Sequence, residues 1–203
     1  MPVMVDTPST PHSPAFYRVR TRVAAIIPQG NEILLVSYCF YGEQFWSLPG
    51  GAPLAGEPPR QTVQREVWEE TGLRVDDLRL LFISDHLYRS GIGIDAGGPG
   101  GLYHELGLYF VAFRHSGAIK IGDEPEHGAQ HIIRDCRFVA LSDIPSLIFY
   151  PSHIVQPLID AGLAGFDIPC RYMENRGMHD HIAPAPRAIL SVGACEPIKT
   201  ETR

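Results

Sequence analysis

Two mostly apolar segments near the start of the chain flank a short polar one, which predicts two β-strands joined by a turn. Tyr17 to Ile27 and Glu32 to Phe40 are both rich in apolar, β-branched and aromatic side chains. Between them, Pro28-Gln29-Gly30-Asn31 has the residue types of a tight turn. We therefore expect these two segments to form a hairpin.

A helix is expected over Arg60 to Thr71, where apolar positions recur one turn apart. Pro58 and Pro59 precede it, and proline suits the first turn because the N–H groups there have no partner within the helix. Gly72 follows and can end the helix in a left-handed conformation. This helix would lie in the middle of the predicted strands.

Later segments predict three more strands and a second helix. The strands are Leu73 to Ile83, with a turn at Asp76-Asp77, then Tyr103 to Arg114, and Cys136 to Leu141. Ser142 or Asp143 can cap a helix that runs through Ile154 to Ala161. The glycine-rich stretch Ser90 to Gly101 is expected to be a mobile loop, which either closes over a substrate or has no role.

Strands interleaved with one central and one C-terminal helix predict the α/β class, with a sandwich of layers. The order does not repeat as strand, helix, strand, which disfavours a doubly wound fold. We expect a flexible N-terminal tail over residues 1–14, one domain over 15–165, and a C-terminal extension or tail over 166–203.

Composition narrows the function classes. The 203 residues suit one domain, and no apolar run is long enough to span a bilayer. The N-terminus lacks the features of a signal peptide, and the four cysteines lack metal-ligand spacing, which favours reduced thiols in a cytoplasmic protein. The net charge of −6 argues against nucleic acid as a partner, and a small anionic substrate would need local positive charge.

Candidate chemistry is concentrated on the predicted helix. Glu66, Glu69 and Glu70 are three and four residues apart, so one face of the helix would carry three carboxylates that repel one another. A divalent cation among them would relieve that repulsion, and hard oxygen ligands suit Mg²⁺ or Mn²⁺ rather than zinc. The alternative is a solvated acidic helix face, which is the usual role of a glutamate-rich segment.

Residues before the helix favour the metal site over that alternative. Glu57 lies in the preceding loop, and Arg65 can pair with it and fix the loop to the helix. Gly50 and Gly51 would let the backbone approach a metal or phosphate closely. A purely structural helix does not need a glycine pair, a loop glutamate and a single arginine at these offsets.

This pattern resembles the complete Nudix box, and every fixed position of that box is filled. The matching run is Gly51, five residues, Glu57, seven residues, and Arg65-Glu66-Val67-Trp68-Glu69-Glu70-Thr71-Gly72-Leu73. The resemblance implies a Nudix-type α/β/α sandwich with a mixed sheet and a loop–helix–loop catalytic motif. It also implies a hydrolase that cleaves the pyrophosphate bond of a nucleoside diphosphate linked to another moiety, such as a nucleotide sugar, ADP-ribose, a dinucleoside polyphosphate or a nucleoside triphosphate.

The resemblance also assigns roles. Glu66 and Glu70 would be direct ligands of Mg²⁺, for which Mn²⁺ can substitute, and Glu69 would be a ligand or the base that deprotonates water. Glu57 would be an outer ligand oriented by Arg65, so that Glu69, Glu66 and Arg65 form the catalytic set. Gly51 would contribute to the metal site through its backbone. The alternative is a Nudix-like regulatory domain that binds nucleotides without turnover, but such domains usually lose box glutamates.

Substrate-binding residues are less defined. Phe45 could stack on a base or pack in the core, and Tyr88 could do the same or simply end a strand. Glu126 lies where many Nudix hydrolases have a distal carboxylate, and a solvated loop is its alternative role. The expected partner is a small nucleotide, with no membrane, and homodimer formation is left open.

Overall fold

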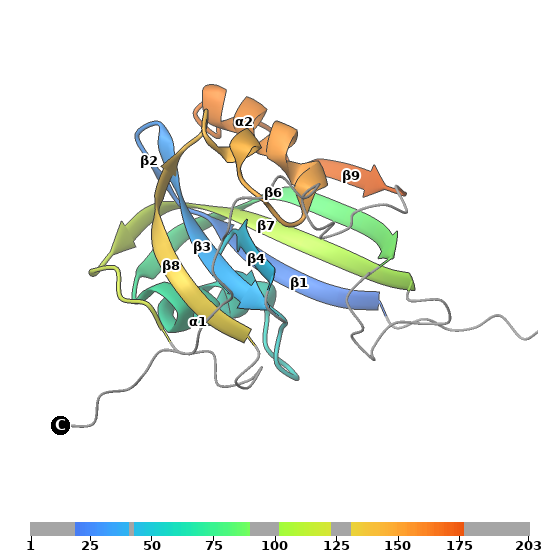
Figure 1. Cartoon of the computed structure of the whole chain (residues 1–203), viewed down its shortest axis with the longest axis horizontal. Coiled ribbons are helices and arrows are strands. Elements are labelled where there is room, and N and C mark those ends of the chain that lie inside the picture. The colour runs from blue at the N-terminus through green and yellow to red at the C-terminus, as the bar shows by residue number, and fades with distance from the viewer. Residues whose placement is uncertain (1–18, 41–42, 90–101, 123–130, 177–203) are drawn as a thin grey trace, which may run out of the picture.

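The strands of the chain form two β-sheets that pack against each other in a computed structural model, which describes residues 19–40, 43–89, 102–122 and 131–176 (Figure 1). The larger sheet has the order β5-β1-β7-β6-β9. Its strands are β1 (Val19–Ile26), β5 (Gly50–Gly51), β6 (Arg74–Arg89), β7 (Leu102–Ser116) and β9 (Arg171–Asn175). Pairing is parallel between β1 and β7 and between β6 and β9, and antiparallel elsewhere, so the sheet is mixed.

The smaller sheet is antiparallel and is built around one central strand, β3. Its strands are β2 (Pro28–Gln29), β3 (Glu32–Phe40), β4 (Glu43–Ser47) and β8 (His131–Ala140). β3 pairs with each of the others. Apolar side chains of both sheets share one core, which includes Ile26 of β1 and Ile33 of β3.

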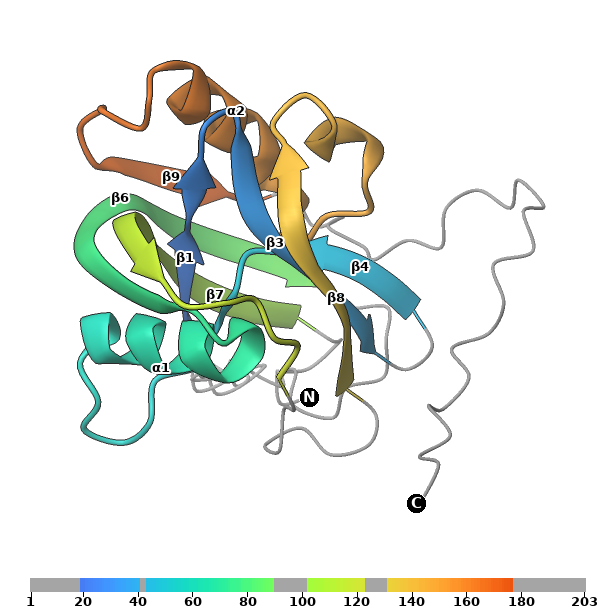
Figure 2. The same cartoon turned by 90° about the vertical axis from the view of Figure 1, so that its left-hand side faces the viewer.

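Two α-helices cover opposite sides of the sheets, as Figure 2 shows. α1 (Pro59–Thr71) buries Val63 and Val67 in one apolar cluster. α2 (Val155–Leu163) buries Leu158 in the other, after two 3₁₀ turns at Ile144–Ser146 and Ser152–Ile154. The expected α/β/α sandwich with a mixed sheet is therefore confirmed.

Three of the expected elements differ in the structure. The early segments do not pair as a hairpin, because β1 joins the larger sheet while β3 joins the smaller one, and only the two-residue β2 folds back onto β3. No turn interrupts β6 at Asp76-Asp77; Asp77 adopts a positive φ of 54° within a continuous strand. Asp143 precedes only a 3₁₀ turn and makes no side-chain cap, so the helix begins later, at Val155.

The C-terminal extension also contains a strand that its sequence does not indicate. β9 pairs in parallel with β6 and extends the larger sheet. Within the described ranges, no helix is long and apolar enough to cross a membrane. Cys136 and Cys170 are free thiols, the first buried and the second exposed.

Candidate functional site

The C-terminal end of α1 is fixed by backbone hydrogen bonds from two directions. Gly72 adopts a φ of 71°, which favours glycine, and its N–H donates to the carbonyl of Trp68. The segment after β7 returns to the same helix end, where the N–H groups of Lys120 and Gly122 donate to the carbonyls of Thr71 and Glu70, respectively. These contacts hold the acidic part of α1 in place.

Four carboxylates of the motif lie in and before α1, and we call them the box carboxylates. They are Glu57, Glu66, Glu69 and Glu70. Arg65 contacts three of them and is the centre of the arrangement.

Arg65 and Glu57 form a two-point ion pair, which confirms the pairing expected from the sequence. The Nε atom of Arg65 lies 2.9 Å from Oε1 of Glu57, and Nη2 lies 3.0 Å from Oε2. The hydrogen bond from Arg65 lowers the pKa of Glu57 to about 2, with a smaller contribution from the N–H of Leu54. Glu57 is therefore ionised at neutral pH and joins the loop to the helix.

Glu66 is buried directly against the glycine pair. Its carboxylate forms an ion pair with Nη1 of Arg65 at 2.9 Å, yet burial raises its pKa above the ordinary value. A Cβ atom on Gly51 would collide with this carboxylate. The missing side chain at Gly51 is thus what lets the Glu66 carboxylate reach the backbone of β5.

Glu70 lies one turn further along α1 and is completely buried. Its carboxylate accepts hydrogen bonds from the Tyr38 hydroxyl at 2.6 Å and from the Gly50 N–H at 2.8 Å. Glu69 instead points outward, with its side chain 41% exposed and 3.0 Å from Arg65. The three helical glutamates therefore separate into two that face β5 and one that faces solvent beside Arg65.

Arg22 of β1 is a further charged residue at this site, and the sequence analysis missed it. Its guanidinium donates to the Leu48 carbonyl at 3.1 Å, and its charge acts on both Glu66 and Glu70. Its position in the strand could have indicated this role. Arg22 is two residues before the buried Ala24, so both side chains lie on the same, core-facing side of β1.

Charge and chemistry together make the site suited to a hard divalent cation. Four box carboxylates face two guanidinium groups, those of Arg65 and Arg22, which leaves two negative charges unbalanced when all are ionised. In the described parts of the chain, no three Asp, Glu, His or Cys side chains converge tightly enough to enclose an ion as they stand. The side chains that could bind a cation here nevertheless all offer oxygen atoms. Because Gly51 has no side chain, the Glu66 carboxylate lies directly beside the backbone of β5.

The aromatic residues considered for substrate binding are brought into one buried cluster. Phe45 and Tyr88 are 8% and 7% exposed, and both rings meet Tyr150, with centroids 6.1 Å and 5.9 Å away, respectively. Phe45 also stacks on Tyr38, which binds Glu70, so the cluster supports the acidic site from behind. Neither ring offers an open face, and Glu126 lies outside the described residues.

Sequence comparisons match part of this chain to proteins named RNA pyrophosphohydrolases. An RNA pyrophosphohydrolase from Pseudoalteromonas translucida is 43% identical over 49 residues, which are 24% of this chain and 28% of that relative. An RNA pyrophosphohydrolase from Psychromonas ingrahamii is 37% identical over 70 residues, or 34% of this chain and 38% of that relative. The chain thus matches about a third of the length of these proteins.

Solved structures and a family model extend the likeness to most of the chain. The MutT NUDIX hydrolase from Burkholderia pseudomallei has a TM-score of 0.50 and 26% identity, covering 70% of this chain and 97% of that one. The MutT protein from Bacillus halodurans has the same fold, with a TM-score of 0.52 and 21% identity over 70% and 82% of the two chains. The NUDIX domain model matches residues 17–155. The chain belongs to the NUDIX domain family.

Proposed function

We propose that this protein is a Mg²⁺-dependent pyrophosphohydrolase that cleaves a nucleoside diphosphate linked to another moiety. The observation that carries the proposal is the position of the Glu66 carboxylate, buried against Gly51 while Arg65 holds Glu57 and Glu69 on the neighbouring side. This arrangement leaves two negative charges that a divalent cation would balance. Relatives named RNA pyrophosphohydrolases support the same class of bond.

The residues have separate roles in this proposal. Glu66 would hold the cation together with the backbone of Gly51, and Mn²⁺ could replace Mg²⁺. Such a cation, when bound, neutralises phosphate oxygens and lowers the pKa of a bound water. Glu70 would fix the glycine pair through the Gly50 N–H, and Glu57 would hold Arg65 in place. Glu69 is the exposed carboxylate and is the candidate to accept a proton from the attacking water.

Glutamine variants of Glu66 and Glu69 test the proposal. Each should retain its fold and lose turnover by about 10²- to 10³-fold, because each removes a charge needed in the transition state. Glu70 is a poorer choice, because its two buried oxygens accept from the Tyr38 hydroxyl and the Gly50 N–H, and a glutamine has only one acceptor oxygen for these two donors. The matched control is Glu174→Gln, whose carboxylate is 57% exposed on β9.

Turnover is measured with nucleotide sugars, ADP-ribose, dinucleoside polyphosphates, nucleoside triphosphates and 5′-triphosphorylated RNA, and melting curves check the fold. Wild-type cleavage with loss in both glutamate variants supports the site. Equal turnover in Glu66→Gln, Glu69→Gln and Glu174→Gln would show that neither Glu66 nor Glu69 takes part in the reaction. Binding without cleavage by the wild type would favour a regulatory nucleotide-binding domain instead.

A further inference from the structure

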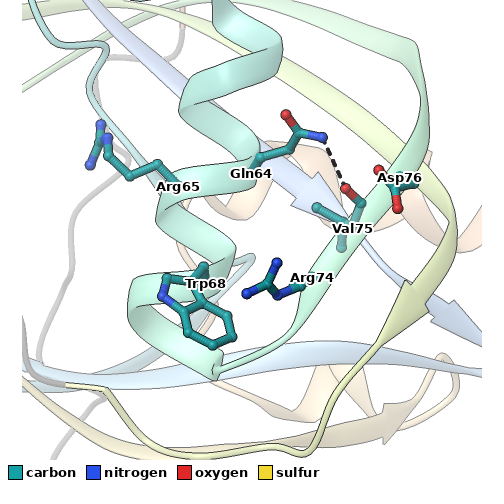
Figure 3. A pocket seen from close by; sticks show the side chains of 6 residues that line it. All are labelled: Gln64, Arg65, Trp68, Arg74, Val75 and Asp76. Atoms are coloured by element: carbon teal, nitrogen blue, oxygen red, sulfur yellow. Dashed lines mark hydrogen bonds between the residues drawn. The ribbon is translucent and has the colours of Figure 1, made fainter.

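An open pocket lies on the outer side of α1, away from the two sheets' shared core (Figure 3). Its volume is about 420 Å³, within the range of small-molecule sites. Gln64, Arg65 and Trp68 of α1 and Arg74, Val75 and Asp76 of β6 line it. The box carboxylates do not line this pocket, so the proposed metal site does not account for it.

Trp68 gives the pocket an aromatic surface that the fold does not bury. The residue is 51% exposed, although the other tryptophan of the chain, Trp46, is 9% exposed. The Arg74 guanidinium lies over the Trp68 ring, 5.0 Å from its centroid, as Figure 3 shows. A large indole that remains half exposed beside a cavity is typical of a surface that stacks on a planar ligand.

Arg74 gives the pocket a positive charge, and the carboxylate of Asp76, two residues further along β6, also lines the pocket. Across the described ranges, Arg74 forms no ion pair, whereas Arg65 is paired with Glu57, Glu66 and Glu69. The chain has a net charge of −6, so most of its surface would repel an anionic ligand. The guanidinium of Arg74 is a local exception. Indole and guanidinium together complement a ligand that carries both an aromatic ring and a phosphate.

The pocket also borders the proposed site of hydrolysis. Arg65 lines it, and in Figure 3 the Arg65 side chain extends away from Trp68 and Arg74, on the side where it holds the box carboxylates. The side-chain amide N–H of Gln64 donates to the Val75 carbonyl at 3.2 Å. The side-chain carbonyl oxygen of Gln64 therefore remains available to accept from an N–H of a nucleobase.

We propose that this pocket is a nucleotide subsite, in which a nucleobase stacks on Trp68 and a phosphate pairs with Arg74. It would hold a nucleoside monophosphate unit of the substrate while the bond to be cut lies at the box carboxylates. As a substrate subsite it rests on the function proposed above, but its binding property does not depend on catalysis.

The binding test uses AMP and GMP in the presence of EDTA, since these probes contain no anhydride bond and no metal is needed. In a Trp46→Phe background, Trp68 is the sole tryptophan and reports stacking by fluorescence. We expect saturable quenching, at least about tenfold weaker binding in Arg74→Gln, corresponding to about 1.4 kcal/mol, and weaker binding of ribose 5-phosphate. Arg137→Gln is the matched control, because Arg137 lies 4.9 Å over the ring of Trp46 in the other sheet.

Calorimetry on the otherwise unchanged chain, with Trp68→Ala as the variant, repeats the test without the Trp46 substitution. Absence of saturable AMP and GMP binding at millimolar concentration would overturn the subsite, as would equal binding by the wild type and Arg74→Gln. Kinetics separate the two proposals. Trp68→Ala should raise KM with kcat unchanged, whereas a chain that binds AMP but cleaves nothing would keep the pocket and refute the hydrolase.

Discussion

Arg65 and Gly51 organise the acidic site by different physical means. Arg65 supplies positive charge to three carboxylates and keeps Glu57 ionised. Gly51 supplies space, because the Glu66 carboxylate occupies the volume where a side chain would begin. Both requirements follow from the motif spacing, so these residues could be identified from sequence. The sequence places Arg22 on a core-facing side of β1, but its position beside Glu66 depends on which strands β1 pairs with.

The space at Gly51 makes a specific prediction. Gly51→Ala should displace the Glu66 carboxylate and lower kcat/KM by about 10²-fold, the effect of a misplacement of about 1 Å. Gly56→Ala is the control, since no atom lies within 4 Å of its added Cβ and only its φ of 81° is strained. Steady-state kinetics with melting curves compare the two variants. Equal kcat/KM in both would mean that the close approach at Gly51 has no role.

At the scale of elements, local signals predicted α1 correctly and long-range pairing did not follow from the sequence. α1 has its proline start and glycine end within the segment itself. The partners of β1 do not lie next to it in sequence; it pairs with β7, whose residues come 85 positions later, as from Val19 to His104. β9 was missed for the same reason, since its register on β6 depends on contacts with residues such as Asp85, far away in the chain.

Asp85 of β6 connects this strand to β9 and to the residue that follows it through ion pairs and hydrogen bonds. It accepts hydrogen bonds from the Tyr172 hydroxyl at 2.9 Å and from both terminal nitrogens of Arg176 at 3.0 and 3.1 Å, and it contacts His104 at 2.7 Å. Burial alone would raise the pKa of Asp85, but the hydrogen bonds from Tyr172, His104 and Arg176 outweigh it and lower the pKa.

This lowered pKa predicts the acid dependence of stability. The folded-state pKa lies below the unfolded one, so the stabilisation is complete above the unfolded pKa and is lost as pH falls through the folded pKa. Asp85→Asn should destabilise the fold at pH 7 by about 1–3 kcal/mol, and it should lose less stability than the wild type as the pH falls below the unfolded pKa of aspartate. Denaturant unfolding at several pH values measures this. An unchanged acid limb in Asp85→Asn, matching that of Glu174→Gln, would contradict the network.

At the scale of the whole molecule, fold and motif are specified far better than the substrate. The NUDIX match covers residues 17–155, while the curated relatives match only about a third of their own length. A net charge of −6 disfavours binding through a broad positive surface, so anion recognition must be local. Arg74 beside Trp68 is one such local feature, and the box carboxylates with a cation would be the other.

The central claim is that water attacks a phosphorus atom at the box carboxylates with the help of a divalent cation. The most direct measurement is the mass of the phosphate products formed in ¹⁸O-labelled water by the full chain with Mg²⁺. We expect one ¹⁸O atom in one product of each cleaved anhydride, no product in EDTA, and recovery when Mg²⁺ or Mn²⁺ is restored. Cleavage that continues unchanged without divalent metal, or products without ¹⁸O on phosphorus, would contradict the account.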